Sequence, residues 1–387
     1  MSNRQRFADD VGGKTTSTAK RYKLVRQKEL TVKKLIGLMA LSLAMVFAMG
    51  AASAADKLKV GFIYVGPVGD HGWTYQHDQG RLAIEKELGD KVETVFVEKV
   101  AEGPDAERTI TRLARQGAGL IFTTSFGFMD PTLKVAKRFP KVKFEHATGY
   151  KRSENVATYN ARFYEGRYII GQIAAKMSKS GVAGYVASFP IPEVVMGINS
   201  FILGAQTVNS NFKVKVIWVN SWFDPGKEAD AAKVLIGQGA DMITQHTDST
   251  APLQIAAEKG AMGFGQASDM IKFAPKAQLT SIVDNWAPYY VRRTKAVLNG
   301  TWKTSDAWDG LADGTVEMAP YTNMPSDVMA MAKKTQALIT TGKLHPFTGP
   351  LYKQDGSMAL AAGKVMDDGT LAGMNWYVKG IDGKLPK

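Results

Sequence analysis

The chain has 387 residues, of which 45% are hydrophobic, which is ample for a buried core and too long for a single compact lobe. It contains no Cys, which excludes disulfides, thiolate metal sites, a cysteine nucleophile and a lipid-modified cysteine. The formal net charge is +13, but residues 1–54 hold ten Lys/Arg against three Asp/Glu, a net of +7, which leaves +6 for the rest. Because that remainder is not gathered in runs, the charge gives no sign of nucleic-acid binding.

The N-terminal segment has the three parts of a secretory signal. Basic residues, among them Lys33 and Lys34, precede an apolar run from Leu35 to Ala48, and small residues follow up to Ala54. A basic region, an apolar region and an A-x-A site predict cleavage, here after Ala54. The alternative is an uncleaved anchor, since the apolar run is nearly long enough to span a membrane.

Strand and helix patterns alternate from residue 58 onward. Strands are predicted at 58–65, 92–97 and 120–123, and helices at 73–88 and 107–116. This alternation indicates right-handed βαβ units and a parallel sheet with helices on both faces.

The second half of the chain repeats the first. Residues 59–65 resemble 182–188, residues 116–121 resemble 238–243, and residues 143–147 resemble 263–267, at offsets that differ little. We therefore expect two similar α/β lobes, each within the usual size of a domain. Ligands of such sheets bind at the carboxyl ends of the strands, so the loops of two facing lobes would form one central cleft.

Two of those loops carry an aromatic residue beside a helix start. Trp73 ends the glycine-rich loop 66–74, and Trp222 lies in the loop 220–226. Two aromatics on facing lobes can hold a flat ring, and stacking is worth about 1–3 kcal/mol per nucleobase. The competing interpretation is that both are core residues at helix starts, which the Gly, Pro and Asp residues around them disfavour.

Other loops at the same edge supply further candidates. Phe126 would form an apolar wall, and Glu193 would accept a hydrogen bond, although a surface Glu at a helix start is the commoner case. His246 and Asp248 offer polar groups, although Asp248 or Ser249 could equally cap the following helix. The same ambiguity applies to the remaining candidates, which are Asp269, Asp284 and Trp286.

Signatures of catalysis are missing from the sequence. The five histidines form no H-E-x-x-H pattern, and there is neither a G-x-S-x-G elbow nor a G-x-x-x-x-G-K-[ST] phosphate loop. We expect no enzyme, no cofactor and no metal. The alternative is a secreted nucleoside hydrolase, because aspartates 248, 269 and 284 could converge on a calcium ion.

Residues 58–320 resemble the basic-membrane-protein (BMP) family of substrate-binding proteins for ABC importers, whose characterised members bind purine nucleosides. The resemblance rests on the segments 70–74, with Gly80, and 221–225, on the stretch from Phe163 to Ala175, and on the segments 265–269 and 280–284. It implies a type I periplasmic binding protein fold, with Trp73 and Trp222 at the positions of two ring-stacking phenylalanines. It also implies a periplasmic location and a membrane permease as partner.

Two positions depart from the family pattern. Ala267 stands where the family has an Asp, and Asp284 stands where it has a Lys. The resemblance implies that those two residues serve the sugar hydroxyls of a nucleoside. Their replacement favours a free nucleobase, and aspartates that accept from an exocyclic amine favour adenine.

The prediction is therefore an α/β protein of the periplasmic binding protein type I class, with two doubly wound parallel-sheet lobes joined by crossover strands around a cleft. The first lobe is expected at 57–160 and 281–314, the second at 161–280, with 315–387 completing both. The lobes would flex near Asn160 and Ile282 and close on the ligand. We expect a periplasmic monomer that binds a purine base; a nucleoside or a sugar in the same fold is the alternative.

Overall fold

The computed structural model describes residues 21, 26 and 57–386. Apart from residues 21 and 26, the expected signal segment and its cleavage site after Ala54 lie outside these residues. The chain from Lys57 onward forms one compact unit. None of the helices in the described part of the chain combines the length and the apolar character needed to cross a membrane.

The first sheet has six parallel strands in the order β11-β5-β4-β3-β1-β2. Its strands are β1 (Leu58–Ile63), β2 (Val92–Val97), β3 (Leu120–Thr123), β4 (Lys143–Ala147), β5 (Val156–Ala161) and β11 (Asp306–Asp309). Its helices are α2 (Trp73–Leu88), α3 (Pro104–Arg115), α4 (Met129–Arg138) and α9 (Ala287–Leu298), with short 3₁₀ turns at Gly89–Lys91 and Phe126–Phe128.

The second sheet has seven strands in the order β12-β10-β9-β8-β6-β7-β15, all parallel except β12, which is antiparallel to β10. Its strands are β6 (Val182–Ala187), β7 (Lys213–Trp218), β8 (Met242–His246), β9 (Met262–Gly265), β10 (Gln278–Asp284), β12 (Val316–Met318) and β15 (Ile381–Asp382). Its helices are α5 (Phe163–Met177), α6 (Pro192–Gln206), α7 (Pro225–Gly237), α8 (Ala251–Glu258) and α10 (Ser326–Thr340), with a 3₁₀ turn at Ile271–Phe273.

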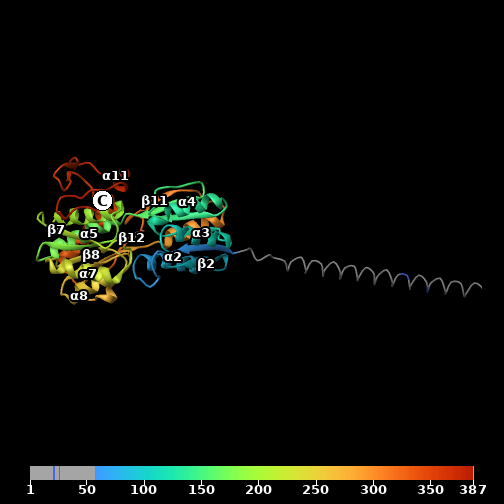
Figure 1. The fold of residues 1–387 in the computed structure, drawn as a ribbon, viewed down its shortest axis with the longest axis horizontal. Helices are drawn as coiled ribbons and strands as arrows, with labels where there is room; N and C mark the ends of the chain where they lie inside the picture. The colour runs from blue at the N-terminus through green and yellow to red at the C-terminus, as the bar shows by residue number, and fades with distance from the viewer. Residues whose placement is uncertain (1–20, 22–25, 27–56, 387) are drawn as a thin grey trace, which may run out of the picture. The chain divides into compact units, whose positions relative to one another are not determined.

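The two sheets share one internal order. Strands β4-β3-β1-β2 in the first correspond to β9-β8-β6-β7 in the second, as the repeats in the sequence predict. Figure 1 shows the two groups, with β7, β8, α5, α7 and α8 in one and β2, α2, α3 and α4 in the other. The predicted fold class, two parallel sheets with helices on their faces, is confirmed.

The first predicted elements agree closely with the structure. The helix at 73–88 and the strands at 92–97 and 120–123 have the predicted bounds. Helix α3 begins at Pro104 and not at Glu107, because proline at the first helical position has a suitable φ and lacks only an N–H that would be unpaired. The strand predicted at 58–65 ends at Ile63, although Tyr64 still donates its N–H to Val97.

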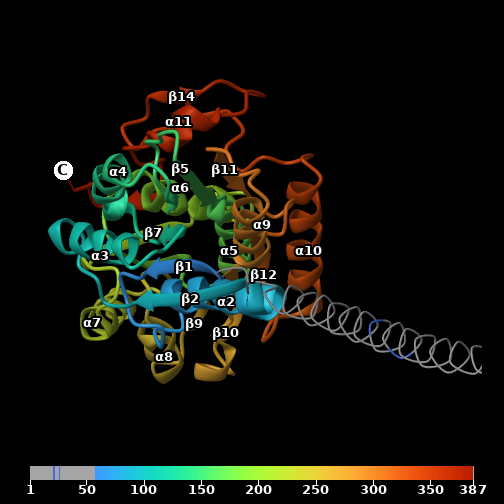
Figure 2. The same ribbon diagram turned by 90° about the vertical axis from the view of Figure 1, so that its right-hand side faces the viewer.

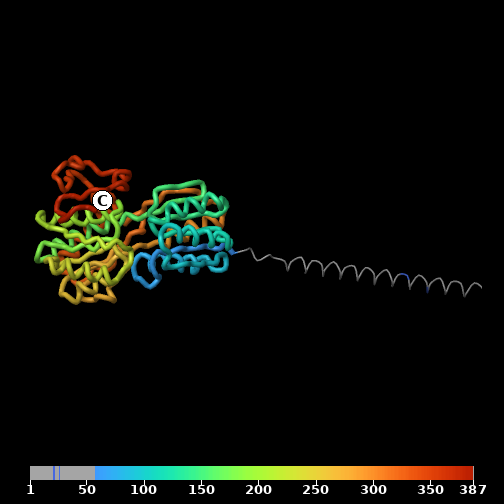
Figure 3. The backbone as a smooth tube through the Cα atoms, in the orientation of Figure 1, coloured from blue at the N-terminus to red at the C-terminus, as the bar shows by residue number. Residues whose placement is uncertain are grey.

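The chain passes between the sheets three times, after β5, after β10 and after β11. The tube in Figure 3 shows these crossings as green and orange segments. Asn160 lies in β5 and Ile282 in β10, each next to a crossing, so the expected hinge positions are strand ends. The exact lobe boundaries stay a prediction.

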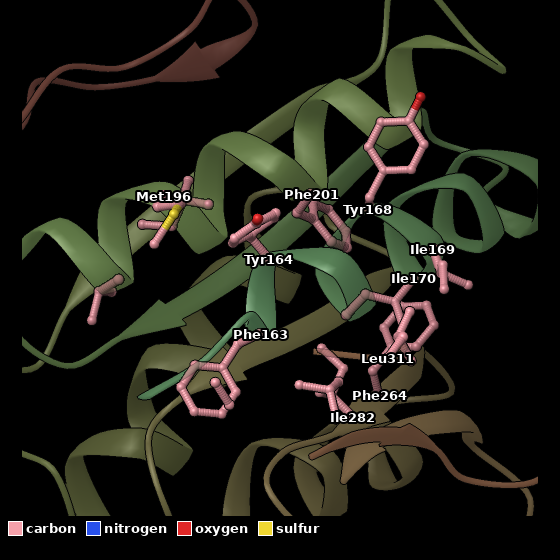
Figure 4. Packing of buried hydrophobic residues seen from close by; sticks show 14 of the residues in the cluster. Phe163, Tyr164, Tyr168, Ile169, Ile170, Met196, Phe201, Phe264, Ile282 and Leu311 are labelled. Atoms are coloured by element: carbon pink, nitrogen blue, oxygen red, sulfur yellow. The ribbon is translucent and has the colours of Figure 1, made fainter. Parts of the chain in front are cut away.

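Helix α5 lies at the centre of the second lobe and is buried over most of its circumference. In Figure 4 its side chains Tyr168, Ile169 and Ile170 extend to different sides, while Phe201 comes from α6 and Ile282 from β10. Burial on all sides explains why the sequence of α5 has no polar face.

The C-terminal segment covers one side of the second lobe. It contains the hairpin β13 (Leu351–Tyr352) with β14 (Met358–Leu360), helix α11 (Asp368–Ala372) and β15, which extends the second sheet beside β7. Figure 2 shows β14 and α11 together in the red part of the chain.

Candidate functional site

Loops from both lobes enclose one cavity at the carboxyl ends of the strands. It contains about 360 Å³ of space free of protein atoms, its opening to solvent included. Its lining residues are Val65, Trp73, Ser125, Phe126, Thr148, Glu193, Trp222, His246, Asp248 and Gln266.

Trp73 is the first residue of α2 and is fixed from behind. Its indole Nε1 donates to the carbonyl of Thr124 at 2.6 Å, and its ring packs edge-on against Trp286 and His77, with centroid distances of 5.6 and 4.3 Å. Trp286 in turn stacks on the His77 ring at 4.8 Å. These contacts hold one indole in a defined orientation at the wall of the cavity.

Trp222 belongs to the second lobe and is held more loosely. The loop after β7 ends at Asp224, whose side chain accepts from the N–H of Lys227 and caps α7. The indole of Trp222 packs against Phe189 at 5.0 Å and donates to Glu102 of the first lobe at 3.3 Å. Trp222 therefore lines the cavity from the second lobe, whereas Trp73 lines it from the first.

Four polar side chains of the second lobe line the cavity: Gln266, Glu193, His246 and Asp248. Glu193 lies in the first turn of α6, His246 ends β8, and the Nε2 of His246 lies 3.4 Å from the Oε1 of Glu193. Within the part of the chain that the structure describes, Glu193 Oε2, His246 Nδ1 and Asp248 Oδ2 are buried without a hydrogen-bond partner. Since unpaired buried polar atoms cost free energy, these three groups are suited to a ligand.

Asp70 and Asp248 form a carboxyl pair across the lobes. Asp70 accepts three backbone N–H bonds at the start of α2, at 2.8 Å from Gly72, 3.0 Å from Thr74 and 2.9 Å from Tyr75. Burial raises the pKa of Asp70 to about 6 in spite of these bonds. Burial also raises the pKa of Asp248 well above its usual value, and the nearby carboxylates add to the shift, Asp70 foremost.

Arg167 is the buried cation of this region. Its guanidinium donates to Thr244 at 3.2 Å and to the side chain of Gln266, which lines the cavity. Asp284 is fully buried, and burial, followed by repulsion from Glu193, raises its pKa, which Arg167 opposes. The charge of Arg167 therefore offsets part of the negative charge behind the cavity wall.

The two lobes contact each other around the cavity. A Cβ atom added at Gly72 would lie 2.2 Å from the carbonyl oxygen of Asp248, so only glycine permits this approach. Gln76 donates to the carbonyl of Asp284 at 2.6 Å, and Ser268 donates to the carbonyl of His71. The structure thus describes a closed cleft.

Four residues in these loops have left-handed backbone, with φ of 59° at His71, 59° at Thr148, 51° at Asn220 and 62° at Ala267. Such a φ is costly for a β-branched residue such as Thr148. Backbone strain of this kind concentrates at ligand-binding loops, where the surrounding structure maintains it.

A family model described as "ABC transporter substrate-binding protein PnrA-like" matches residues 57–355. The chain belongs to this family. Its members are substrate-binding proteins and not enzymes, which confirms both the resemblance seen in the sequence and the prediction of a binding protein.

Two relatives and one solved structure illustrate the similarity. A purine-binding protein of Brucella abortus (strain 2308) is 68% identical over 338 residues, covering 87% of this chain and 97% of that protein. A Haloferax volcanii protein with the name of an ABC transporter glucose-binding protein is 33% identical over 338 residues, covering 87% and 83%. An ABC transporter solute-binding protein of Aeropyrum pernix K1 shares the fold with a TM-score of 0.67 at 18% identity, covering 81% and 95%.

The cavity of this PnrA-like protein brings together six of the nine residues singled out in the sequence. These are Trp73, Phe126, Glu193, Trp222, His246 and Asp248. Asp269 is exposed and accepts from the N–H of Ile271 and from Gln278. Trp286 and Asp284 lie behind the wall, and their roles in binding stay predictions.

The N-cap of α8 is Thr250, and neither Asp248 nor Ser249; it makes no side-chain cap hydrogen bond. The hydroxyl of Ser249 accepts from the N–H of Ala251 in the first turn, whereas Asp248 lines the cavity. Glu228 of α7 accepts from both the N–H and the hydroxyl of Ser249, at 3.1 and 2.6 Å, and so fixes this loop.

Sequence reasoning missed several residues of the site. Thr148 follows β4, a strand used in detecting the repeat, so its loop could have been included with the others. Arg167 and Glu102 had no local signal, since one lies inside a helix and the other between a strand and a helix. Arg167 reaches the site through the packing of α5 within the second lobe, and Glu102 accepts from Trp222 only where the two lobes meet.

A second hollow adjoins the cavity along the crossover strands. It contains about 850 Å³, open solvent included, and shares Phe126, Thr148 and Glu193 with the first. Among residues 21, 26 and 57–386, no group of three His, Cys, Asp or Glu side chains is arranged to hold a metal ion.

Proposed function

We propose that this protein is the periplasmic receptor of an ABC importer and that it binds a purine nucleobase, with adenine favoured. The observation that carries the proposal is the pairing of Trp73 and Trp222, one from each lobe, on a single cavity. The name of the Brucella abortus relative, a purine-binding protein at 68% identity, supports the ligand class.

The aromatic walls suit a flat ring. An indole on each side of a purine buries both of its faces, at about 1–3 kcal/mol per stacked side chain. Because Trp73 is fixed by Thr124 and Trp286 while Trp222 is half-exposed, we infer that the base docks on Trp73 and that Trp222 closes over it.

The polar wall suits the edge of the ring. Glu193 and Asp248 offer oxygen atoms to an exocyclic amine, and His246 offers a ring nitrogen that donates or accepts according to its tautomer. Burial lowers the pKa of His246, which favours the neutral ring in this wall. An amine facing two carboxyl groups is the reason that adenine is favoured.

Two residue positions of the site favour a free base over a nucleoside as the ligand. The resemblance implies sugar-binding side chains at Ala267 and Asp284, but the first lacks a polar side chain and the second is fully buried behind the wall. Because a ribose would find no sugar-binding side chain at these two positions, adenosine is expected to bind more weakly than adenine.

Transport follows from closure. The open lobes admit the base, the base bridges them, and the closed form is what a membrane permease would recognise. The protein would act as a periplasmic monomer with a cleaved signal segment, needing neither a cofactor nor a metal.

Isothermal titration of the mature protein tests the proposal. Adenine should give the tightest binding, with adenosine and guanosine weaker. The absence of heat from every purine, with protein freed of bound solute by unfolding and refolding, would reject it. Glucose belongs in the same series because of the name of the Haloferax volcanii relative, and tight glucose binding would favour a sugar receptor.

A further inference from the structure

Asp248 is the least satisfied acid of the cavity. The residue is 5% exposed and lines the cavity, and its side chain has an oxygen without a hydrogen-bond partner among the described residues. No backbone N–H of its own loop is directed at it, in contrast to Asp70, which accepts three. A carboxylate with so few donors is poorly stabilised in its ionised form.

The charges around Asp248 are predominantly negative. It faces Asp70 from the loop before α2, Glu228 from α7, Asp284 from β10 and Glu193 from α6. His246, two residues away, is favoured as a neutral ring, and Arg167 acts on Glu193 and Asp284. Nearby anions without a dedicated cation favour the protonated acid.

We propose that Asp248 is a neutral carboxylic acid in the closed site and that it selects the base by pairing with an amino edge. Its carbonyl oxygen accepts from the exocyclic amine, and its hydroxyl donates to the neighbouring ring nitrogen. This inference rests on the proposed purine function and adds a residue that determines specificity, with a proton as co-ligand.

The chemistry distinguishes the two forms of the acid. Adenine presents a donor beside an acceptor, which a neutral carboxyl group complements with two hydrogen bonds. An ionised carboxylate has only acceptors, so its second oxygen would oppose the lone pair of the ring nitrogen. Guanine presents two adjacent donors on its N1 and N2 edge, which an ionised carboxylate can pair with, so its affinity should depend less on pH.

Closure of the cleft raises the pKa of Asp248 and so couples adenine binding to the uptake of a proton. In an open cleft Asp248 is in contact with water and titrates near the ordinary value for an aspartate, about 4. Burial in the closed cleft raises its pKa well above that value. Closure on adenine at neutral pH therefore takes up about one proton, and the affinity should fall about tenfold per pH unit between the two pKa values.

The proton belongs to Asp248 and not to Asp70. The two acids are close enough to titrate as a pair, but Asp70 has three backbone donors that stabilise its anion, so Asp248 is the one that retains the proton. The variants Asp248→Asn and Asp70→Asn separate these assignments.

The experiment measures adenine and guanine affinity from about pH 5 to pH 9, with proton uptake obtained from titrations in buffers of different ionisation enthalpy. Wild-type protein should lose adenine affinity as pH rises and take up a proton. Asp248→Asn, whose amide has the same donor and acceptor pattern, should bind adenine with no pH dependence and no proton uptake. Asp248→Ala should bind weakly at every pH, and Asp70→Asn should still take up a proton.

Two results would overturn the inference. One is adenine affinity that stays constant across the range without proton uptake; the other is loss of proton uptake in Asp70→Asn but not in Asp248→Asn. Thermal melting of each variant shows whether it is folded. Failure of adenine to bind wild-type protein at any pH would instead reject the proposed function.

Discussion

Replacing Trp222 with alanine removes one aromatic wall of the cavity while leaving the other in place. Trp222 is half-exposed, packs against Phe189 at a centroid distance of 5.0 Å, and donates one hydrogen bond to Glu102. Few contacts of the folded protein depend on it, so the main loss is the stacking energy with the ligand.

The expected loss of affinity follows from that single wall. Stacking contributes about 1–3 kcal/mol, and each 1.4 kcal/mol is a factor of ten, so Trp222→Ala should weaken adenine binding about 5- to 150-fold. Trp222→Phe keeps an aromatic face and loses only the exposed hydrogen bond to Glu102, so it should bind within about fivefold of the wild type.

The matched control is Trp376→Ala, a half-exposed tryptophan of the C-terminal segment outside the cavity. Titration calorimetry gives the affinities, and thermal denaturation shows whether each variant is folded. Wild-type affinity in Trp222→Ala, or an equal loss in Trp376→Ala, would refute the stacking argument.

Three further variants test the closed cleft and the buried charges. Gly72→Ala should weaken adenine binding by about 1–3 kcal/mol, because its Cβ would meet the Asp248 carbonyl across the lobes. Gly69→Ala, with open space around its Cβ, should bind normally, and equal affinities of the two variants would show that the close approach of Gly72 to Asp248 is not needed for binding. Burial lowers the pKa of His146 to about 3, so the unfolded chain protonates this residue before the folded protein does as pH falls below about 6.5. In urea denaturation, the free energy of unfolding of His146→Asn should therefore fall by about 1.4 kcal/mol less per pH unit than that of the wild type between about pH 6 and pH 4, and parallel pH profiles would contradict this. Arg167→Met should lower the free energy of unfolding at pH 7 by about 1–3 kcal/mol, because the buried side chains of Thr244 and Gln266 lose a donor, and a change near zero would show that these hydrogen bonds are not required.

The sequence predicts the fold well because its signals are local or repeated. The apolar strands, the tryptophan at the start of α2 and the three repeated segments define two parallel sheets without any knowledge of their packing. Helix α3 begins at Pro104, three residues before the predicted start at Glu107.

The site is predicted less completely because it depends on how the lobes meet. Residues at the carboxyl end of a strand or in the loop after it, such as His246 and Trp222, could be found from the order of strands and loops. The exposure of Asp269 and the burial of Asp284 could not, since both follow neighbouring strands in similar sequence contexts. Arg167 projects from a helix toward the site, and only the packing of α5 under the second sheet places it there.

A crystal structure of the mature protein with adenine tests the central claim most directly. The purine ring should lie between the indoles of Trp73 and Trp222, with its amine within hydrogen-bonding distance of Glu193 or Asp248. Adenine bound outside this cavity, or inside it without contact to either tryptophan, would contradict the proposed receptor site.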